Sequence, residues 1–237
     1  MTRSKARKRP TSSISTGRGP RASARKRRGI GRPGAGEQTV GREALITRTC
    51  EMLTSLPPNK ITRAEVARHM NVDPSLIRYY FRDRSTLLVA AAERLIDIFQ
   101  RLLEDELAHS DMSPAGRLRA RVTALLKLNI TYPFFHRLMI DELAKIDSKP
   151  AARFIEELTH KGVTGYGAII DAGVKDGTLR RVNSAFLFLA AIGLTEFFVN
   201  GMPILRMAMD KDFDERLIAS RYREFMCELL LSGLKAR

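Results

Sequence analysis

Residues 61–81 contain capping residues that predict two short helices joined by a tight turn. Thr62 is a good helix N-cap, and Glu65 three positions later completes a capping box. Asp73 caps the second helix, whose first position is Pro74, where a proline costs no backbone hydrogen bond. Two such helices pack at a steep angle, so the segment has the layout of a helix-turn-helix.

The same segment has an apolar side and a side suited to nucleic acid. The expected inner positions are Val66, Ala67, Met70, Val72, Ile77 and Phe81. The outer face of the second helix carries Pro74, Ser75, Arg78 and Tyr79. Such a helix fits the major groove of DNA, where arginine can donate two hydrogen bonds to guanine. A plain three-helix packing unit with surface charges is the alternative interpretation.

Helical spacing of apolar residues continues along the rest of the chain. No stretch shows sustained alternation with turn signals, so we expect an all-α fold without a sheet. Proline and glycine breakers divide the chain into about nine helices. Their expected spans are roughly 38–56, 62–70, 73–81, 83–107, 114–131, 133–146, 150–176, 183–200 and 213–234.

Residues 42–90 resemble the N-terminal domain of TetR-family transcriptional regulators. The resemblance rests on the stretch ITRAEVARHMNVDPSLIRYYFRDRSTLL, especially Tyr80-Phe81, Arg84 and Leu87-Leu88. It implies an all-helical protein in which three helices bind DNA and later helices form a ligand pocket and a dimer interface. The domains then expected are a basic tail at 1–36, a helix-turn-helix domain at 37–84, and a helical ligand-binding and dimerisation domain at 85–237.

Carried over by position, the resemblance implies three kinds of DNA contact. Thr62 and Arg63 open the supporting helix beside the DNA backbone. The residues implied to face base edges are Pro74, Ser75 and Arg78. The residues implied to contact phosphates are Tyr79, Tyr80 and Arg84, the last at a helix start where amide groups also favour anions.

The sequence departs from the family pattern at three positions in this region. Asn71 stands where the family usually has glycine, although asparagine also tolerates the left-handed conformation. Arg78 replaces a common tyrosine, so the base preference of relatives does not transfer. Arg84 replaces a usual lysine and keeps the positive charge.

The net charge of +15 is concentrated at one end of the chain. Twelve of the 41 Lys and Arg residues lie in residues 1–36, and none of the 26 acidic residues does. Such a composition predicts disorder and a polyanionic partner. Residues 29–34 match GxGxxG, but without a preceding strand a dinucleotide site is not expected. Instead Arg32, flanked by glycine and proline, is predicted to enter the minor groove as part of a short arm, with a plain solvated tail as the alternative.

A ligand pocket and a dimer interface are expected in the second domain on the strength of the resemblance. The candidate pocket residues are Phe135, His136, Met139, Tyr166, Ile170, Phe188 and Glu196. Residues of these types are more often ordinary core, and Glu196 could instead be capped across the subunit interface. Aromatic and methionine side chains with few charges suggest a small apolar or amphipathic ligand. The homodimer is expected to form through about 183–200 and 213–234, with a monomer core as the alternative.

Other classes of protein find little support in the sequence. Cys50 and Cys227 are far apart and without a histidine pair, so we expect buried thiols in a reducing compartment and no metal site. No acid pair, GxSxG or P-loop indicates an enzyme or a cofactor. Without a signal peptide or a long apolar span, a cytoplasmic location is expected. The predicted function is therefore a ligand-responsive, dimeric transcriptional repressor on double-stranded DNA. The alternatives are a non-specific nucleoid-type protein, or a helical small-molecule-binding protein or enzyme with a basic tail.

Overall fold

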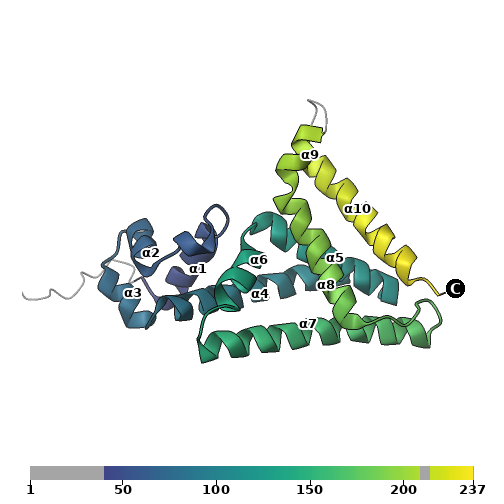
Figure 1. Cartoon of the computed structure of the whole chain (residues 1–237), viewed down its shortest axis with the longest axis horizontal. Coiled ribbons are helices and arrows are strands. Elements are labelled where there is room, and N and C mark those ends of the chain that lie inside the picture. Colours follow the sequence, from purple (N-terminus) through teal and green to yellow (C-terminus); the bar gives the residue numbers. More distant parts are fainter. Residues whose placement is uncertain (1–39, 209–213, 237) are drawn as a thin grey trace, which may run out of the picture. The chain divides into compact units, whose positions relative to one another are not determined.

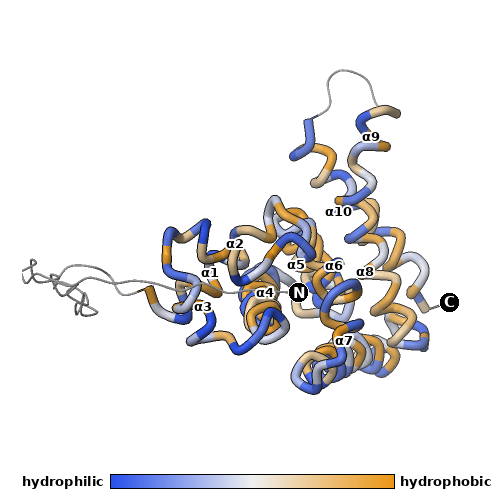
Figure 2. Tube along the Cα trace, turned by 60° about the vertical axis from the view of Figure 1, so that its left-hand side comes forward, coloured by the Kyte–Doolittle hydropathy of each residue, from blue (hydrophilic) through white to orange (hydrophobic). Residues whose placement is uncertain are grey.

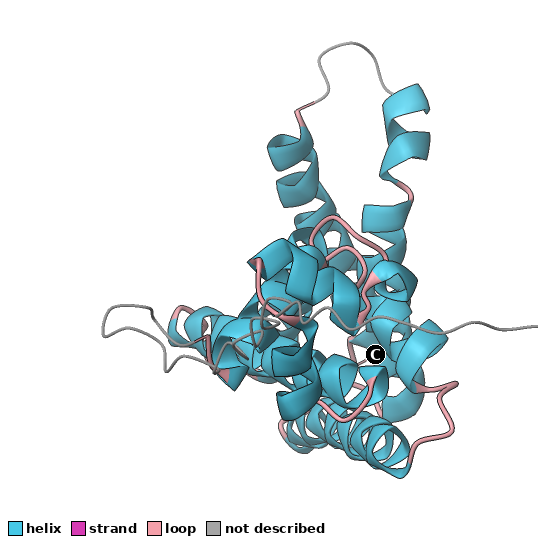
Figure 3. Ribbon diagram, turned by 90° about the vertical axis from the view of Figure 1, so that its left-hand side faces the viewer, coloured by secondary structure: helices cyan, strands magenta, loops and turns pink. Residues whose placement is uncertain are grey.

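The computed structural model describes residues 40–208 and 214–236, and this part of the chain is all-helical, as the sequence predicts (Figures 1 and 3). A 3-10 turn, η1 (Pro58–Lys60), and a π-helical turn, η2 (Leu138–Leu143), accompany the α-helices. The α-helices are α1 (Arg42–Met52), α2 (Arg63–Met70), α3 (Pro74–Tyr80), α4 (Arg84–Ala108), α5 (Pro114–Thr131), α6 (Phe135–Arg137), α7 (Lys149–Lys175), α8 (Ser184–Asn200), α9 (Met202–Ala208) and α10 (Glu215–Leu234).

Helices α4, α5, α8 and α10 begin at polar side chains that accept hydrogen bonds from the free amide groups of the first turn, whereas α7 has no such side-chain cap. The carboxylate of Asp83 accepts from the Thr86 amide at 2.8 Å at the start of α4. The hydroxyl of Ser113 accepts from the Gly116 amide at 3.0 Å at the start of α5. Asn183 and Asp214 cap α8 and α10 in the same way. These local bonds explain why most helix starts can be read from the sequence.

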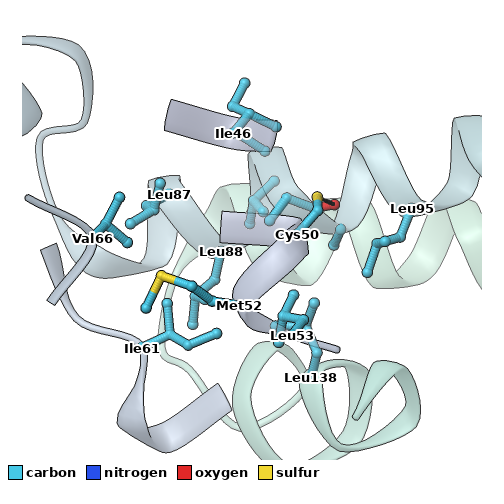
Figure 4. Close-up of a cluster of buried hydrophobic side chains, with 14 of the residues drawn as sticks. Ile46, Cys50, Met52, Leu53, Ile61, Val66, Leu87, Leu88, Leu95 and Leu138 are labelled. Atoms are coloured by element: carbon cyan, nitrogen blue, oxygen red, sulfur yellow. Dashed lines mark hydrogen bonds between the residues drawn. The ribbon is translucent and has the colours of Figure 1, made fainter. Parts of the chain in front are cut away.

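A first buried cluster joins the N-terminal helices to the middle of the chain. It contains apolar side chains of α1–α4, among them Leu53, Ile61 and Leu88, and it continues into α5, η2 and α7 through Leu138 and its neighbours (Figure 4). Because α4 contributes along much of its length, it ties the helix-turn-helix to the later helices. Burial of this many apolar side chains fixes the position of α2 and α3 on α4.

A second buried cluster lies among α5, α7, α8 and α10. It includes Leu118 and Val122 of α5, Tyr166 of α7 and Met226 of α10. The end of α10 is also fastened by backbone hydrogen bonds to the segment between α7 and α8, where the Arg180 amide donates to the Leu234 carbonyl at 2.8 Å. An isolated antiparallel bridge at the same place forms no sheet.

The structure differs from the prediction at two helices. The expected helix at 133–146 is a single α-helical turn followed by η2, in which the Ala144 amide donates to the Met139 carbonyl five residues back. Helix α9 is not predicted from the sequence, because Pro203 suggests a break. Proline is tolerated in the first turn of a helix, where its missing N–H has no partner to lose, and α9 begins at Met202.

Candidate nucleic-acid interface

The turn between α2 and α3 has the geometry that the sequence predicts. The Thr62 hydroxyl accepts from the Glu65 amide at 3.1 Å, and the Asp73 carboxylate accepts from the Ser75 amide at 2.7 Å. Asn71 is left-handed, with φ 52° and ψ 43°, and it takes the place where the family usually has glycine. The hydrogen bonds from the Ser75 side chain and backbone lower the pKa of Asp73, so this cap is ionised at neutral pH.

The second half of the predicted capping box is not formed. The carboxylate of Glu65 bonds to the Arg68 guanidinium and lies 3.2 Å from His69 Nε2, rather than reaching back to Thr62. Both partners lie one turn further along α2, and the Arg68 charge attracts the carboxylate more strongly than a neutral amide does. The hydrogen bond with Arg68 is the main cause of a lowered Glu65 pKa.

The inner and outer faces of the motif separate as expected. Val66, Ile77 and Phe81 are fully buried. On α3 the side chains predicted to face base edges, Pro74, Ser75 and Arg78, are all exposed. Tyr79 is 81% exposed, while Tyr80 is half-buried and packs edge-on against the Tyr79 ring, 5.0 Å away. Most of the Tyr79 side chain is thus open to solvent and available to a partner.

Two arginines implied to contact DNA bind the protein itself. Arg63 Nη1 donates to the backbone carbonyls of Phe81 and Arg82, at 3.2 and 2.6 Å. Arg84 donates to the carbonyls of Ile61 and Pro58, at 2.8 and 2.6 Å. The Phe81, Arg82 and Ile61 carbonyls lie outside the α-helices, where a guanidinium can satisfy them, and the Pro58 carbonyl accepts from the Ile61 amide at 2.9 Å as well as from Arg84. Arg84 therefore has a structural role in this structure, and the phosphate contact implied for it stays a prediction.

Arg84 also joins the helix-turn-helix to the middle of the chain. Its Nη1 lies 2.6 Å from Glu142 Oε2 on η2, and the two side chains are only 30% and 14% exposed. One guanidinium thus contacts η1, the segment before α2, and η2. Since π-helical turns are frequently found at functional sites, this junction is a candidate route between the DNA-binding helices and the rest of the protein.

The predicted pocket residues do not form a single group. Phe135 and Met139 belong to the first buried cluster, which also contains the buried side chains of the helix-turn-helix. Tyr166, Ile170 and Phe188 belong to the second. The sequence predicts one continuous helix for the segment that holds Phe135 and Met139. In the structure Phe135 lies on α6 and Met139 lies on η2.

His136 and Glu196, also predicted for the pocket, lie together. His136 Nε2 is 3.4 Å from Glu196 Oε2, and Asn200 Nδ2 donates to Glu196 Oε1 at 3.3 Å. Within the described residues, then, Glu196 has partners in its own chain. The pair connects α6 to α8.

A cavity of about 510 Å³ lies elsewhere, and none of the predicted residues lines it. Its wall comes from the end of α4, the start of α5, and α10, and includes Glu106, Asp111, Arg223 and Cys227. Most of these polar groups have partners in the chain: Glu106 bonds Lys127, Arg223 contacts Glu224, and Asp111 accepts from Ser113. The residues that line this cavity are scattered along the sequence and carry charges of both signs, so no sequence pattern predicts it.

Helices α8 and α10 each leave a stripe of apolar side chains uncovered. On α8 the exposed large side chains are Phe186, Leu189 and Phe197, and on α10 they are Leu217, Phe225 and Leu229. Figure 2 shows the hydropathy of α8 along its length. Among the described helices no single one is long and apolar enough to cross a membrane, although α8 and α9, bent by 60°, pass on length and composition when taken together.

The remaining predictions concern the two cysteines and the basic tail. Cys50 and Cys227 are both buried and free, as expected, and burial raises the pKa of the Cys50 thiol to about 12. Arg32 and the basic tail lie outside the described residues.

A capped helix pair with an open, basic second helix, carried on an all-helical body, defines a helix-turn-helix regulator. The chain belongs to the TetR family of transcriptional regulators, because the family model described as tetracyclin repressor-like, C-terminal domain, matches residues 111–237, more than half of the sequence. This assignment confirms the resemblance seen at residues 42–90 and the expectation that the protein is no enzyme.

Individual relatives agree with the family. The HTH-type transcriptional regulator BetI of Serratia proteamaculans is 35% identical over 91 residues, which are 38% of this chain and 46% of that protein. The chain thus matches about half the length of this curated relative. The ketosteroid transcriptional regulator KstR2 of Mycobacterium tuberculosis has the same fold, with a TM-score of 0.62 at 14% identity over 83% of this chain and 95% of KstR2. AibR, solved with isovaleryl coenzyme A and operator DNA, gives 0.62 at 16% identity over 80% and 97%.

Proposed function

We propose that this protein is a cytoplasmic, homodimeric repressor that reads its operator with α3 and leaves it when a small molecule binds the C-terminal helices. The observation that carries the DNA-reading step is the exposed face of α3. There Ser75, Arg78 and Tyr79 are open to solvent on a helix whose two ends are held by Asp73 and by the buried Phe81. A rigid helix with solvent-exposed polar side chains can enter the major groove at little entropic cost.

The exposed apolar stripes on α8 and α10 support the dimer. Phe186, Leu189 and Phe197 are 71%, 61% and 68% exposed on one helix, and Phe225 is 58% exposed on the other. Side chains of this size gain free energy when a second copy covers them. A Cβ atom on Gly193 of α8 would meet nothing within 4 Å, so this position leaves room for a partner helix to approach closely. Two recognition helices in one dimer would read half-sites about one helical turn apart.

Selection of preferred sites from random DNA with the purified protein tests the proposal, and Arg78→Ala sharpens it. We expect the variant to lose about 1–3 kcal/mol of discrimination at one or two base pairs per half-site while other positions keep their preference. Lys60→Ala, an exposed basic residue of η1, serves as the control for general charge loss.

Two results would count against sequence-specific reading. One is a uniform loss of affinity on all sequences in Arg78→Ala, since that is the behaviour of a phosphate contact. The other is equal binding to selected and random DNA at raised salt, which would favour the nucleoid-type alternative.

A further inference from the structure

A half-buried positive charge lies among the C-terminal helices without a carboxylate paired with it in the described part of the chain. Arg121 of α5 is half-buried, and its Nε is fully covered without a hydrogen-bond partner. Within residues 40–208 and 214–236 no carboxylate pairs with it. Its guanidinium carbon instead lies 4.9 Å from the Tyr166 ring centre and 5.8 Å from that of Phe99. Aromatic faces attract a cation but leave its N–H groups unbonded.

A second unsatisfied group lies against the first. Tyr166 of α7 is only 2% exposed, and its O–H finds no acceptor among the described residues, because the polar group that faces it is the Arg121 guanidinium, itself a donor. Burial raises the pKa of this hydroxyl to about 12, with the nearby Arg121 charge opposing the rise, so it remains a donor at neutral pH. The Tyr166 oxygen can accept from Arg121, but the Tyr166 O–H and the Arg121 Nε–H then still have no acceptor among the described residues. Buried polar groups are nearly always bonded, so this indicates a missing partner.

The surrounding sequence makes room for this arrangement. A Cβ atom on Gly165 would lie 2.7–2.8 Å from the guanidinium of Arg121, and one on Gly162 would lie 2.5 Å from the Phe188 ring. Glycine is disfavoured inside helices, yet α7 has both in its middle. The Phe188 ring, 6.1 Å from that of Tyr166, then forms an apolar wall beside the two donors.

We propose that Arg121 and Tyr166 bind the carboxylate of a small organic acid whose apolar part packs on Phe188 and the second buried cluster. The carboxylate would accept from the Arg121 guanidinium and from the Tyr166 hydroxyl, which supplies the acceptor both donors lack. A single guanidinium balances a monoanion, whereas a phosphate monoester would bring nearly two negative charges. The proposal names the chemical class of the effector and therefore rests on the proposed function. The large polar cavity between α4, α5 and α10 contains neither residue.

Four probes with the same eight-carbon chain separate the head groups: octanoate, octanol, octylamine and octyl phosphate. Calorimetric titration of the full chain, without DNA, should show that octanoate binds and that octanol and octylamine bind at least about tenfold more weakly. Tyr166→Phe and Arg121→Met should each weaken octanoate binding by about tenfold to a hundredfold. Arg119→Met, which removes an exposed charge two residues away on α5, should leave it unchanged.

A structural role for Arg121 predicts a different result. If the guanidinium served only folding, Arg121→Met would lower the melting temperature, whereas removal of an unmatched charge should leave it equal or higher. The proposal is overturned if no probe binds, if octanol or octyl phosphate matches octanoate, or if both site variants bind octanoate normally. Binding of octanoate by a protein that ignores DNA would instead defeat the proposed function alone.

Discussion

Replacing Glu142 by Gln should lower the melting temperature of this protein by about 4–8 °C. The change keeps the size and one acceptor oxygen of the side chain but removes the negative charge that faces Arg84. The guanidinium then remains bound to the Ile61 and Pro58 carbonyls, 2.8 and 2.6 Å away, with its charge no longer balanced. Because Arg84 stands between η1, α4 and η2, the loss falls on the junction of the helix-turn-helix with the rest of the chain.

The size of the effect depends on the exposure of the pair. Exposed ion pairs contribute about 0–1 kcal/mol, and breaking a fully buried pair costs about 3–5 kcal/mol. With side chains 30% and 14% exposed, Arg84 and Glu142 lie between these limits, so a loss of about 2 kcal/mol is expected. In a chain of this size about 1 kcal/mol corresponds to about 2–4 °C.

Thermal unfolding followed by far-UV circular dichroism measures the effect, with Glu156→Gln, an exposed glutamate of α7, as the matched control. A double-mutant cycle with Arg84→Met isolates the pair itself, and we expect a coupling energy of about 1–2 kcal/mol. A coupling energy below about 0.5 kcal/mol would refute the reasoning, since independent sites give values that small. So would equal melting temperatures for Glu142→Gln and its control.

Three further predictions concern pH, assembly and the tail. Hydrogen bonds from Thr86 and Ser85 lower the Asp83 pKa from 3.8 to about 2, so its stabilisation is complete above pH 3.8 and disappears as the pH falls toward 2. Asp83→Asn should flatten the pH dependence of the unfolding free energy between pH 4 and 2, and an unchanged slope would contradict the role of this cap. Phe197→Glu should convert the dimer to a folded monomer in sedimentation, whereas Ile130→Glu, on exposed α5 surface, should not; a dimeric Phe197→Glu protein would exclude α8 as the interface. Deleting residues 1–31 should weaken DNA binding and reduce its salt dependence, and an identical salt slope would show that the tail does not touch DNA.

The sequence by itself determined the features that depend on near neighbours in the chain. The caps at Thr62 and Asp73, the left-handed turn at Asn71 and the apolar face ending at Phe81 all involve residues within one or two helical turns. Interactions of this range have few alternatives, so a pattern of residue types predicts them. The all-helical class and the TetR resemblance come from the same kind of signal.

Only the tertiary structure decided where long side chains point and which helices share a core. A basic residue at position 84 suggests a phosphate contact, yet Arg84 binds a glutamate 58 residues away. Phe135 and Tyr166 look alike as pocket candidates, but they lie in different buried clusters. No sequence signal pointed to Arg121, because its interest lies in the missing acceptor beside Tyr166 and Phe99, which only the structure shows. Such partners are brought together by packing between distant segments, and the spacing of residues along the chain does not record it.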